Sequence, residues 1–170
     1  MNIAIVGATG NVGRKTLEVL EKKGLTLGNL YLVASSKSAG KKINFQGKDI
    51  VVSELENFDF SKVKIAFFAA GGKISEKFAE KAAKHCLVID NSSFFRMDPD
   101  VPLIVPQVNS DALNNIKKNI IANPNCSTAQ LVIALKPLHD LFVIKRIVVS
   151  TYQSVSGGGK APMDLSLIHI

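Results

Sequence analysis

A cysteine at the start of a predicted helix is the residue of this 170-residue chain best suited to nucleophilic chemistry. Cys126 lies in the stretch Asn-Pro-Asn-Cys-Ser-Thr, residues 123–128. The proline disfavours helix at the residue before it, and the apolar run 131–133 predicts a helix from Ser127 to about Leu138. The N–H groups and the dipole at a helix N-terminus stabilise a thiolate and also bind an oxyanion. The pattern therefore predicts an activated thiol at Cys126.

The second cysteine is an internal comparison. Cys86 follows His85 at the end of a predicted helix and leads into a predicted strand, so we expect a buried, small hydrophobic residue there. Neither cysteine belongs to a C-x-x-C pair or a His-rich cluster. We therefore expect no metal site, and two free thiols in a reducing compartment.

A glycine-rich loop, Gly7-Ala-Thr-Gly-Asn-Val-Gly13, separates a predicted strand at 3–6 from a predicted helix over 11–23. Glycines in such a loop allow a tight turn, close approach of the backbone to a pyrophosphate, and close packing of helix on strand. The N–H groups of the helix N-terminus add an anion site. The loop predicts dinucleotide binding, and the alternative is a tight turn with no ligand.

The end of the second predicted strand bears on which dinucleotide binds. An acidic residue there would accept hydrogen bonds from the ribose 2′-OH of NAD. This chain has Ala-Ser-Ser-Lys-Ser-Ala-Gly at 34–40 instead. Ser35, Lys37 and Ser38 suit a 2′-phosphate, so the sequence favours NADP. The alternative is an ordinary polar loop with a solvated lysine.

The charge balance is basic, with 21 Lys and Arg against 14 Asp and Glu and a net charge of +7. The cations are spread in ones and twos with few aromatic residues between them, which disfavours nucleic-acid binding. A positive field equally favours anionic small molecules. No apolar run is long enough to cross a membrane and no secretory signal is present, so we expect a cytoplasmic protein without membrane contact.

The predicted strands and helices that would position these residues alternate along the chain, as in an α/β fold with a parallel sheet. We expect one face of the first helix to carry Val12, Thr16, Val19 and Leu20. Residues 46–47 form the predicted turn of a hairpin. We place a domain boundary near Pro124, giving a complete domain at 1–124 and the incomplete beginning of another at 125–170. Strands are predicted at 3–6, 30–34, 43–45, 50–52, 65–69, 87–90, 120–122 and 146–153, and helices over 11–23, 75–85 and 127–138.

Four motifs together resemble the bacterial aspartate-semialdehyde dehydrogenases. They are Gly7–Gly13, Asp90-Asn-Ser-Ser-Phe-Phe-Arg-Met97, Asn123–Thr128 and Tyr152-Gln-Ser-Val-Ser-Gly-Gly-Gly-Lys160, and the resemblance runs from Met1 to about Leu165. N-acetyl-glutamyl-phosphate reductase and glyceraldehyde-3-phosphate dehydrogenase are similar more loosely. The resemblance implies a Rossmann-type NADP-binding domain followed by the start of an α+β catalytic and dimerisation domain.

The resemblance also implies a reaction, the NADP-dependent interconversion of aspartyl phosphate and aspartate semialdehyde in lysine, threonine and methionine biosynthesis. Cys126 would attack the acyl phosphate to form a thioester, which NADPH then reduces. Gln153 would orient the substrate, and Arg96 and Asn125 would bind substrate or its phosphate. As alternatives, Gln153 is a polar residue ending a strand and Arg96 is a solvated arginine.

The cofactor contacts implied by the resemblance lie on several segments. They are the loop residues Gly7, Thr9, Gly10, Asn11, Val12 and Gly13, then Ser35, Lys37 and Ser38, and further along Gly71, Gly72, Ser156 and Gly157. Lys37 stands where the family more often has arginine, which keeps the charge but loses the planar fork.

The family's substrate-binding arginine and general-base histidine lie downstream of Tyr152–Lys160. His85, His139 and His169 do not match the motif of that histidine. We therefore interpret the chain as the amino-terminal portion of an enzyme whose full-length form is expected to be a homodimer. We expect little turnover from these residues alone. The alternatives are a non-catalytic NADP-binding fragment and, least favoured, a nucleic-acid-binding domain.

Overall fold

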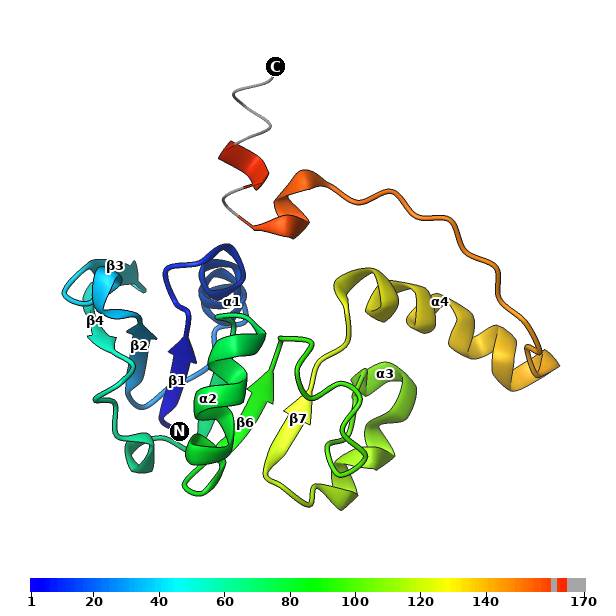
Figure 1. Ribbon diagram of the computed structural model, residues 1–170, viewed down its shortest axis with the longest axis horizontal. Coiled ribbons are helices and arrows are strands. Elements are labelled where there is room, and N and C mark those ends of the chain that lie inside the picture. Colours follow the sequence, from blue (N-terminus) through cyan, green and yellow to red (C-terminus); the bar gives the residue numbers. More distant parts are fainter. Residues whose placement is uncertain (160–161, 165–170) are drawn as a thin grey trace.

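The computed structural model describes residues 1–159 and 162–164. Its centre is a seven-stranded sheet in the order β3-β4-β2-β1-β5-β6-β7 (Figure 1). All neighbouring strands are parallel except β3 and β4. The strands are β1 (Ile3–Val6), β2 (Leu30–Ala34), β3 (Lys42–Phe45), β4 (Lys48–Glu54), β5 (Ile65–Phe68), β6 (Leu87–Asp90) and β7 (Ile120–Ala122), and the helices are α1 (Asn11–Lys22), α2 (Gly72–Ala83), α3 (Pro106–Asn109) and α4 (Cys126–Phe142).

The predicted α/β class is confirmed, and so is the hairpin. Gln46 and Gly47 both have positive φ, 50° and 76°, which joins β3 to β4 by a tight turn of the kind that suits twisted antiparallel strands. The short helix α3 begins at Pro106, in a segment for which the sequence analysis predicted neither a helix nor a strand.

Two apolar clusters hold the helices on opposite faces of the sheet. Alternate side chains of the strands point to opposite faces. Val6, Phe68 and Val88 pack with Phe78 of α2, and Ile5 and Leu32 pack with α1 on the other side. The core therefore fixes the two helices whose N-termini lie beside the ends of β1 and β5.

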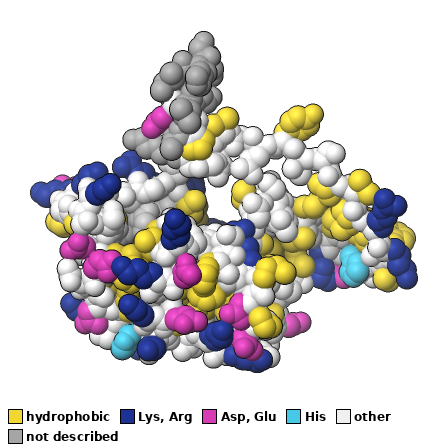
Figure 2. All heavy atoms as spheres, in the orientation of Figure 1, with side chains coloured by type: hydrophobic (Ala, Val, Ile, Leu, Met, Phe, Trp, Pro, Cys, Tyr) yellow, Lys and Arg dark blue, Asp and Glu magenta, His cyan; other side chains and the backbone are white. Residues whose placement is uncertain are grey.

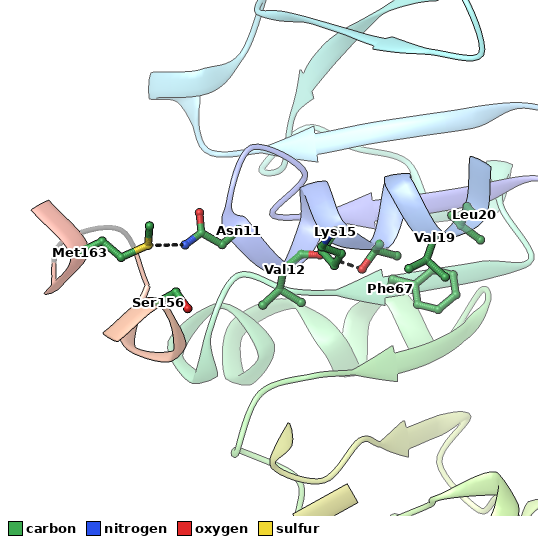
Figure 3. A pocket seen from close by; sticks show the side chains of 9 residues that line it. Asn11, Val12, Lys15, Val19, Leu20, Phe67, Ser156 and Met163 are labelled. Carbon is green, nitrogen blue, oxygen red and sulfur yellow. Dashed lines mark hydrogen bonds between the residues drawn. The ribbon is translucent and has the colours of Figure 1, made fainter. Parts of the chain in front are cut away.

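The residues predicted to share one face of α1, which are Val12, Thr16, Val19 and Leu20, all line one hollow, but only Leu20 of them is buried. The helix buries Gly13, Leu17 and Leu20, whereas Val12 is 52% exposed and Val19 45% exposed. The reason is steric, because Gly13 packs directly on the glycine loop and rotates the Leu17 side inward. Val12 and Val19 border a hollow of about 690 Å³ (Figure 3).

The predicted strand over Arg146–Gln153 does not form. Val143, with a left-handed φ of 52°, ends α4, and the chain then runs extended without a sheet partner among the described residues (Figure 1). A β-strand requires the hydrogen-bonding groups of a neighbouring strand. The apolar β-branched pattern of this segment is therefore not sufficient to form a strand. Among the helices of the described residues, none combines the length and the apolar character needed to cross a membrane.

Candidate active site

A cleft of about 680 Å³ opens at the carboxyl ends of the central parallel strands. Open α/β sheets bind ligands in this crevice. Segments far apart in the sequence meet there: the glycine loop, the residues after β2 and β5, the first turns of α2 and α4, and the segment after residue 155. The lining includes Gly7, Thr9, Gly10, Asn11, Val12, Ser35, Ser36, Ala69, Ala70, Ile74, Cys126, Ser156, Gly157 and Gly159.

The glycine loop has the geometry of a phosphate cradle. Gly7 has φ of 85°, and a Cβ there would lie 2.7 Å from the Ala69 carbonyl oxygen. A Cβ on Gly13 would lie 2.3 Å from the Gly7 oxygen. Gly10 is the N-cap of α1 and brings no capping side chain, so the first N–H groups of α1 face the cleft without a side-chain acceptor. These groups fit a pyrophosphate.

The loop after β2 closes one corner of the cleft. Ser35 occupies the N-cap position of a short 3₁₀ turn, Ser36–Ser38, without a side-chain capping bond, and Lys37 is exposed on this turn. The Thr9 hydroxyl donates to Ser38 Oγ at 3.4 Å, so the glycine loop and this turn are in direct contact. Lys37 and Ser38 lie beside the cleft rather than in its lining.

Arg14 is a cation at this corner that the sequence analysis missed. Its Nε donates to the Thr9 carbonyl oxygen at 3.2 Å, which folds the guanidinium back over the glycine loop. Its position in the first turn after a phosphate-binding loop was the signal available in the sequence.

Cys126 is exposed and is the first residue of α4. Asn125 is the N-cap, and its Oδ1 accepts from the N–H groups of Ser127 at 2.9 Å and Thr128 at 3.4 Å. The predicted position of the thiol at a helix N-terminus is confirmed. The amide of Asn125 has a capping role that the sequence analysis did not assign.

Cys86 lies in a different environment from Cys126. It is buried, as predicted, and its thiol lies 3.4 Å from the Ala82 carbonyl oxygen. Burial raises the pKa of the Cys86 thiol to about 11. Only Cys126 of the two thiols reaches the cleft.

Arg96 lies between two loops. Its Nε donates to the Asn123 carbonyl oxygen at 3.0 Å, and Nη2 donates to that of Asn91 at 3.1 Å. The side-chain amide of Asn123 donates to Asn91 Oδ1 at 2.8 Å. The structure therefore places Arg96 against the loop that leads to Cys126.

Other predicted site residues are less close to the cleft. Gln153 is exposed, and its side chain lies against Gly157 rather than in the lining. Gly71, with φ of 87°, is the N-cap of α2, and Gly72 follows it. Ser156 and Gly157 do reach the cleft. The Asn11 side chain donates to Met163 Sδ at 3.4 Å, which ties this last segment to the start of α1 (Figure 3).

The surface carries mixed charge. Lys and Arg side chains alternate with Asp and Glu over the sheet region, and apolar side chains gather over α4 (Figure 2). Several lysines pair with carboxylates, such as Lys118 with Asp98 at 2.8 Å. Within residues 1–159 and 162–164, no group of three or more His, Cys, Asp or Glu side chains is arranged to hold a metal.

Comparison with known proteins identifies two matching family models. Residues 2–116 match the semialdehyde dehydrogenase NAD binding domain. Residues 135–167 match the semialdehyde dehydrogenase dimerisation domain.

Among curated proteins, aspartate-semialdehyde dehydrogenase of Rickettsia bellii is 52% identical over 96% of this chain and 49% of its own length. Aspartate-semialdehyde dehydrogenase 2 of Vibrio cholerae is 53% identical over the same shares. The chain thus spans about half the length of the curated relatives it matches.

Solved structures agree with this match. Aspartate semialdehyde dehydrogenase II of Vibrio cholerae, complexed with ASA, has a TM-score of 0.93 and 52% identity, over 96% of this chain and 49% of that one. The enzyme of Candida albicans with NADP has a TM-score of 0.67 and 29% identity, over 84% of this chain and 48% of that one. The first family model alone covers more than half of the sequence. The resemblance seen in the four motifs is confirmed: this chain belongs to the semialdehyde dehydrogenase family.

Proposed function

We propose that this chain is the cofactor-binding, nucleophile-bearing half of an NADP-dependent aspartate-semialdehyde dehydrogenase. The reaction is the reductive dephosphorylation of L-aspartyl 4-phosphate to L-aspartate 4-semialdehyde, in lysine, threonine and methionine biosynthesis. The observation that carries the proposal is one cleft lined both by a phosphate-binding glycine loop and by Cys126. The names of the relatives, one complexed with ASA and one with NADP, support it.

The described residues fit a dinucleotide. The glycine loop and the N–H groups at the start of α1 would hold the pyrophosphate. Ser35, Lys37 and Ser38 would hold the 2′-phosphate, and the ends of β5 and α2 near Gly71 would border the nicotinamide. When bound, the nicotinamide supplies the hydride that reduces the acyl carbon.

The chain's own residues would form the acyl-enzyme. The Cys126 thiolate attacks the carbonyl carbon of the acyl phosphate, the C–O bond to phosphate then breaks, and inorganic phosphate leaves with the electron pair. Asn125 occupies the N–H groups of Ser127 and Thr128. Within the part of the chain that the structure describes, the Cys126 N–H has no hydrogen-bond partner, so it is available to the oxyanion. Arg96 and Gln153 would bind phosphate and orient substrate.

The proposal also covers the cellular location of the protein and the oligomeric state of the full-length enzyme. We assign the protein to the cytoplasm as an enzyme of small-molecule biosynthesis, with neither nucleic acid nor membrane as a partner. The match of residues 135–167 to a dimerisation domain supports a homodimer for the full-length enzyme.

The acylation half-reaction tests the proposal without requiring turnover. The chain is incubated with aspartyl phosphate, and peptide mass spectrometry with phosphate release locates the adduct. We expect one acyl group on Cys126 and none on Cys86, and no adduct in Cys126→Ser. Steady-state NADPH formation from aspartate semialdehyde and phosphate should be slight, because the family's downstream arginine and histidine lie outside these residues. Binding of NADPH without acylation would favour a non-catalytic NADP-binding fragment instead.

The preference for NADP is tested at Lys37. Lys37→Glu should weaken NADPH binding about tenfold or more, because a charge-assisted bond to phosphate is replaced by repulsion. NADH binding should hardly change. Fluorescence titration with both nucleotides measures the difference, and Lys48→Glu on the distant hairpin is the matched control. Equal weakening of NADPH and NADH would contradict the assignment.

A further inference from the structure

Asp90 is a fully buried carboxylate beneath the cleft, at the end of β6. Its Oδ1 accepts from the Ser75 hydroxyl at 2.7 Å and from the Ser92 N–H at 3.0 Å. Its Oδ2 accepts from the Ser92 hydroxyl at 2.7 Å. No lysine or arginine of the described residues pairs with it. Burying a carboxyl group without a cation is unfavourable unless hydrogen bonds satisfy it, so this network must keep its geometry.

One arm of the network reaches the helix beside the cofactor cleft. Ser75 is fully buried in the first turn of α2, and its N–H donates to the Gly71 carbonyl oxygen at 3.2 Å. The preceding residue, Ile74, lines the cleft. The bond from Ser75 to Asp90 therefore fixes the start of α2 to the end of β6.

The other arm reaches the loop that carries the thiol. The Asn123 N–H donates to the backbone carbonyl oxygen of Asp90, not to its carboxylate, at 2.8 Å, and the Asn123 side-chain amide donates to Asn91 Oδ1 at 2.8 Å. Asn91 in turn donates to the Phe68 carbonyl oxygen at the end of β5. Arg96 joins both loops through the carbonyl oxygens of residues 91 and 123. Cys126 follows three residues after Asn123.

We infer that the Asp90 side chain is a positioning group that fixes the Cys126 loop relative to the α2 wall of the cofactor cleft. It acts through Ser75 on one side and, on the other, through Ser92 and the loop that follows it, from which Arg96 binds the Asn123 carbonyl oxygen. The inference rests on the proposed role of Cys126 as the nucleophile. Asp90 does not line the cleft and touches no reacting atom. Its effect is geometric, because a displacement of about 1 Å between reacting groups costs roughly a hundredfold in rate.

The carboxylate is required rather than an amide for a specific reason. The Ser92 hydroxyl oxygen already accepts from the Phe94 N–H at 3.1 Å, so its own proton needs an acceptor, which is Asp90 Oδ2. An amide nitrogen at that position would donate instead and leave the Ser92 proton unpaired. Asp90→Asn is therefore a nearly isosteric change that removes the acceptor of the Ser92 proton. The bond from the Ser75 hydroxyl and the bond from the Asn123 N–H to the backbone carbonyl oxygen of residue 90 can both persist.

The test measures how far a bound cofactor shields the thiol. The rate of Cys126 alkylation by iodoacetamide is measured with and without saturating NADP⁺, and the ratio is the protection. We expect strong protection in the unmodified chain. In Asp90→Asn, protection should fall about fivefold or more while the NADP⁺ dissociation constant stays within about twofold. Asn123→Ala, which removes only the amide–amide bond, should act in the same direction. Asp98→Asn, which makes the same chemical change in a surface ion pair, is the control.

The outcomes separate the two proposals. Absence of protection in the unmodified chain would contradict the proposed function itself. Protection kept in both Asp90→Asn and Asn123→Ala would overturn only the present inference. A parallel loss of NADP⁺ affinity and melting temperature in both variants would also overturn it, since Asp90 would then support the whole fold rather than the thiol loop. If Asp90→Asn does not fold, Ser92→Ala, which removes the hydroxyl bonded to Asp90 Oδ2, decides the matter.

Discussion

Large apolar side chains are buried in one region of the molecule and exposed in another. We call the first region, residues 1–125, the sheet body, and the second, residues 126–159 and 162–164, the C-terminal arm. In the sheet body, Phe68 and Val88 are completely buried between sheet and helix. In the arm, Phe142 is 74% exposed and Val148 is 78% exposed. Helix α4 has 17 residues and buries none of them. Both regions contain large apolar residues, and the difference is whether neighbouring helices and strands cover those residues.

The difference shows that apolar patterning specifies a surface that can be buried and does not by itself bury it. The arm has the β-branched residues of a strand at Ile147, Val148 and Val149, yet no strand forms among the described residues. Exposed apolar side chains of this kind are typical of contact surfaces. The match of residues 135–167 to a dimerisation domain agrees with that interpretation.

The largest expected effect contrasts two phenylalanines. Phe68→Ala should lower the free energy of unfolding by about 3–5 kcal/mol, because it opens a cavity between β5 and α2. Phe142→Ala should change it by less than about 0.5 kcal/mol. Urea unfolding followed by circular dichroism measures both. Similar losses would mean that the arm is packed in solution, and the contrast between the regions would fail.

A smaller effect contrasts two glycines with equally close neighbours. A Cβ on Gly13 would meet the backbone oxygen of Gly7 at 2.3 Å, whereas one on Gly157 would meet the side-chain nitrogen of Gln153 at 2.2 Å. Backbone cannot move aside, but an exposed glutamine can.

Gly13→Ala should therefore cost about 1–3 kcal/mol of stability and weaken NADPH binding. Gly157→Ala should cost less than about 0.5 kcal/mol. Thermal unfolding and nucleotide titration of the two variants provide the measurement. A large loss in Gly157→Ala would show that the arm is as rigid as the loop.

The smallest effect concerns pH and the buried thiol of Cys86. The pKa of Cys86 is about 11 in the folded chain, against an ordinary value of 9.0, because burial disfavours the thiolate. Between these values the unfolded chain has lost the proton that the folded chain keeps, so stability falls as pH rises from about 9 to 11. Cys86→Ala should make the stability curve flatter over this range. A curve of unchanged slope in Cys86→Ala would contradict the assignment.

Much of the sheet body was predictable because its signals are local. Continuous apolar runs bounded by glycine or polar residues predicted β1, β2, β6 and β7 at their observed limits. The glycine loop and the position of Cys126 also follow from neighbouring residues.

The rest depends on contacts between distant segments. The inner face of α1 is set by the approach of Gly13 to Gly7, and Val12 and Val19 are consequently exposed. The bonds from Asp90 to Ser75 and from Arg96 to Asn123 join residues with no sequence pattern in common. Whether residues 146–153 form a strand likewise depends on a neighbouring strand, and the local sequence pattern does not show whether that neighbour is present.

The two ends of the sheet limit how copies of this protein can associate. At one end, β3 is a four-residue strand with Lys42 exposed, held by the tight turn at Gln46 and Gly47. At the other, the outer side of β7 is already bonded, since Ala122 donates to the Pro102 carbonyl oxygen and accepts from the Ile104 N–H. Short, charged or covered edges resist strand addition and fibrillar stacking. Addition of further strands at either edge of the described sheet is therefore disfavoured.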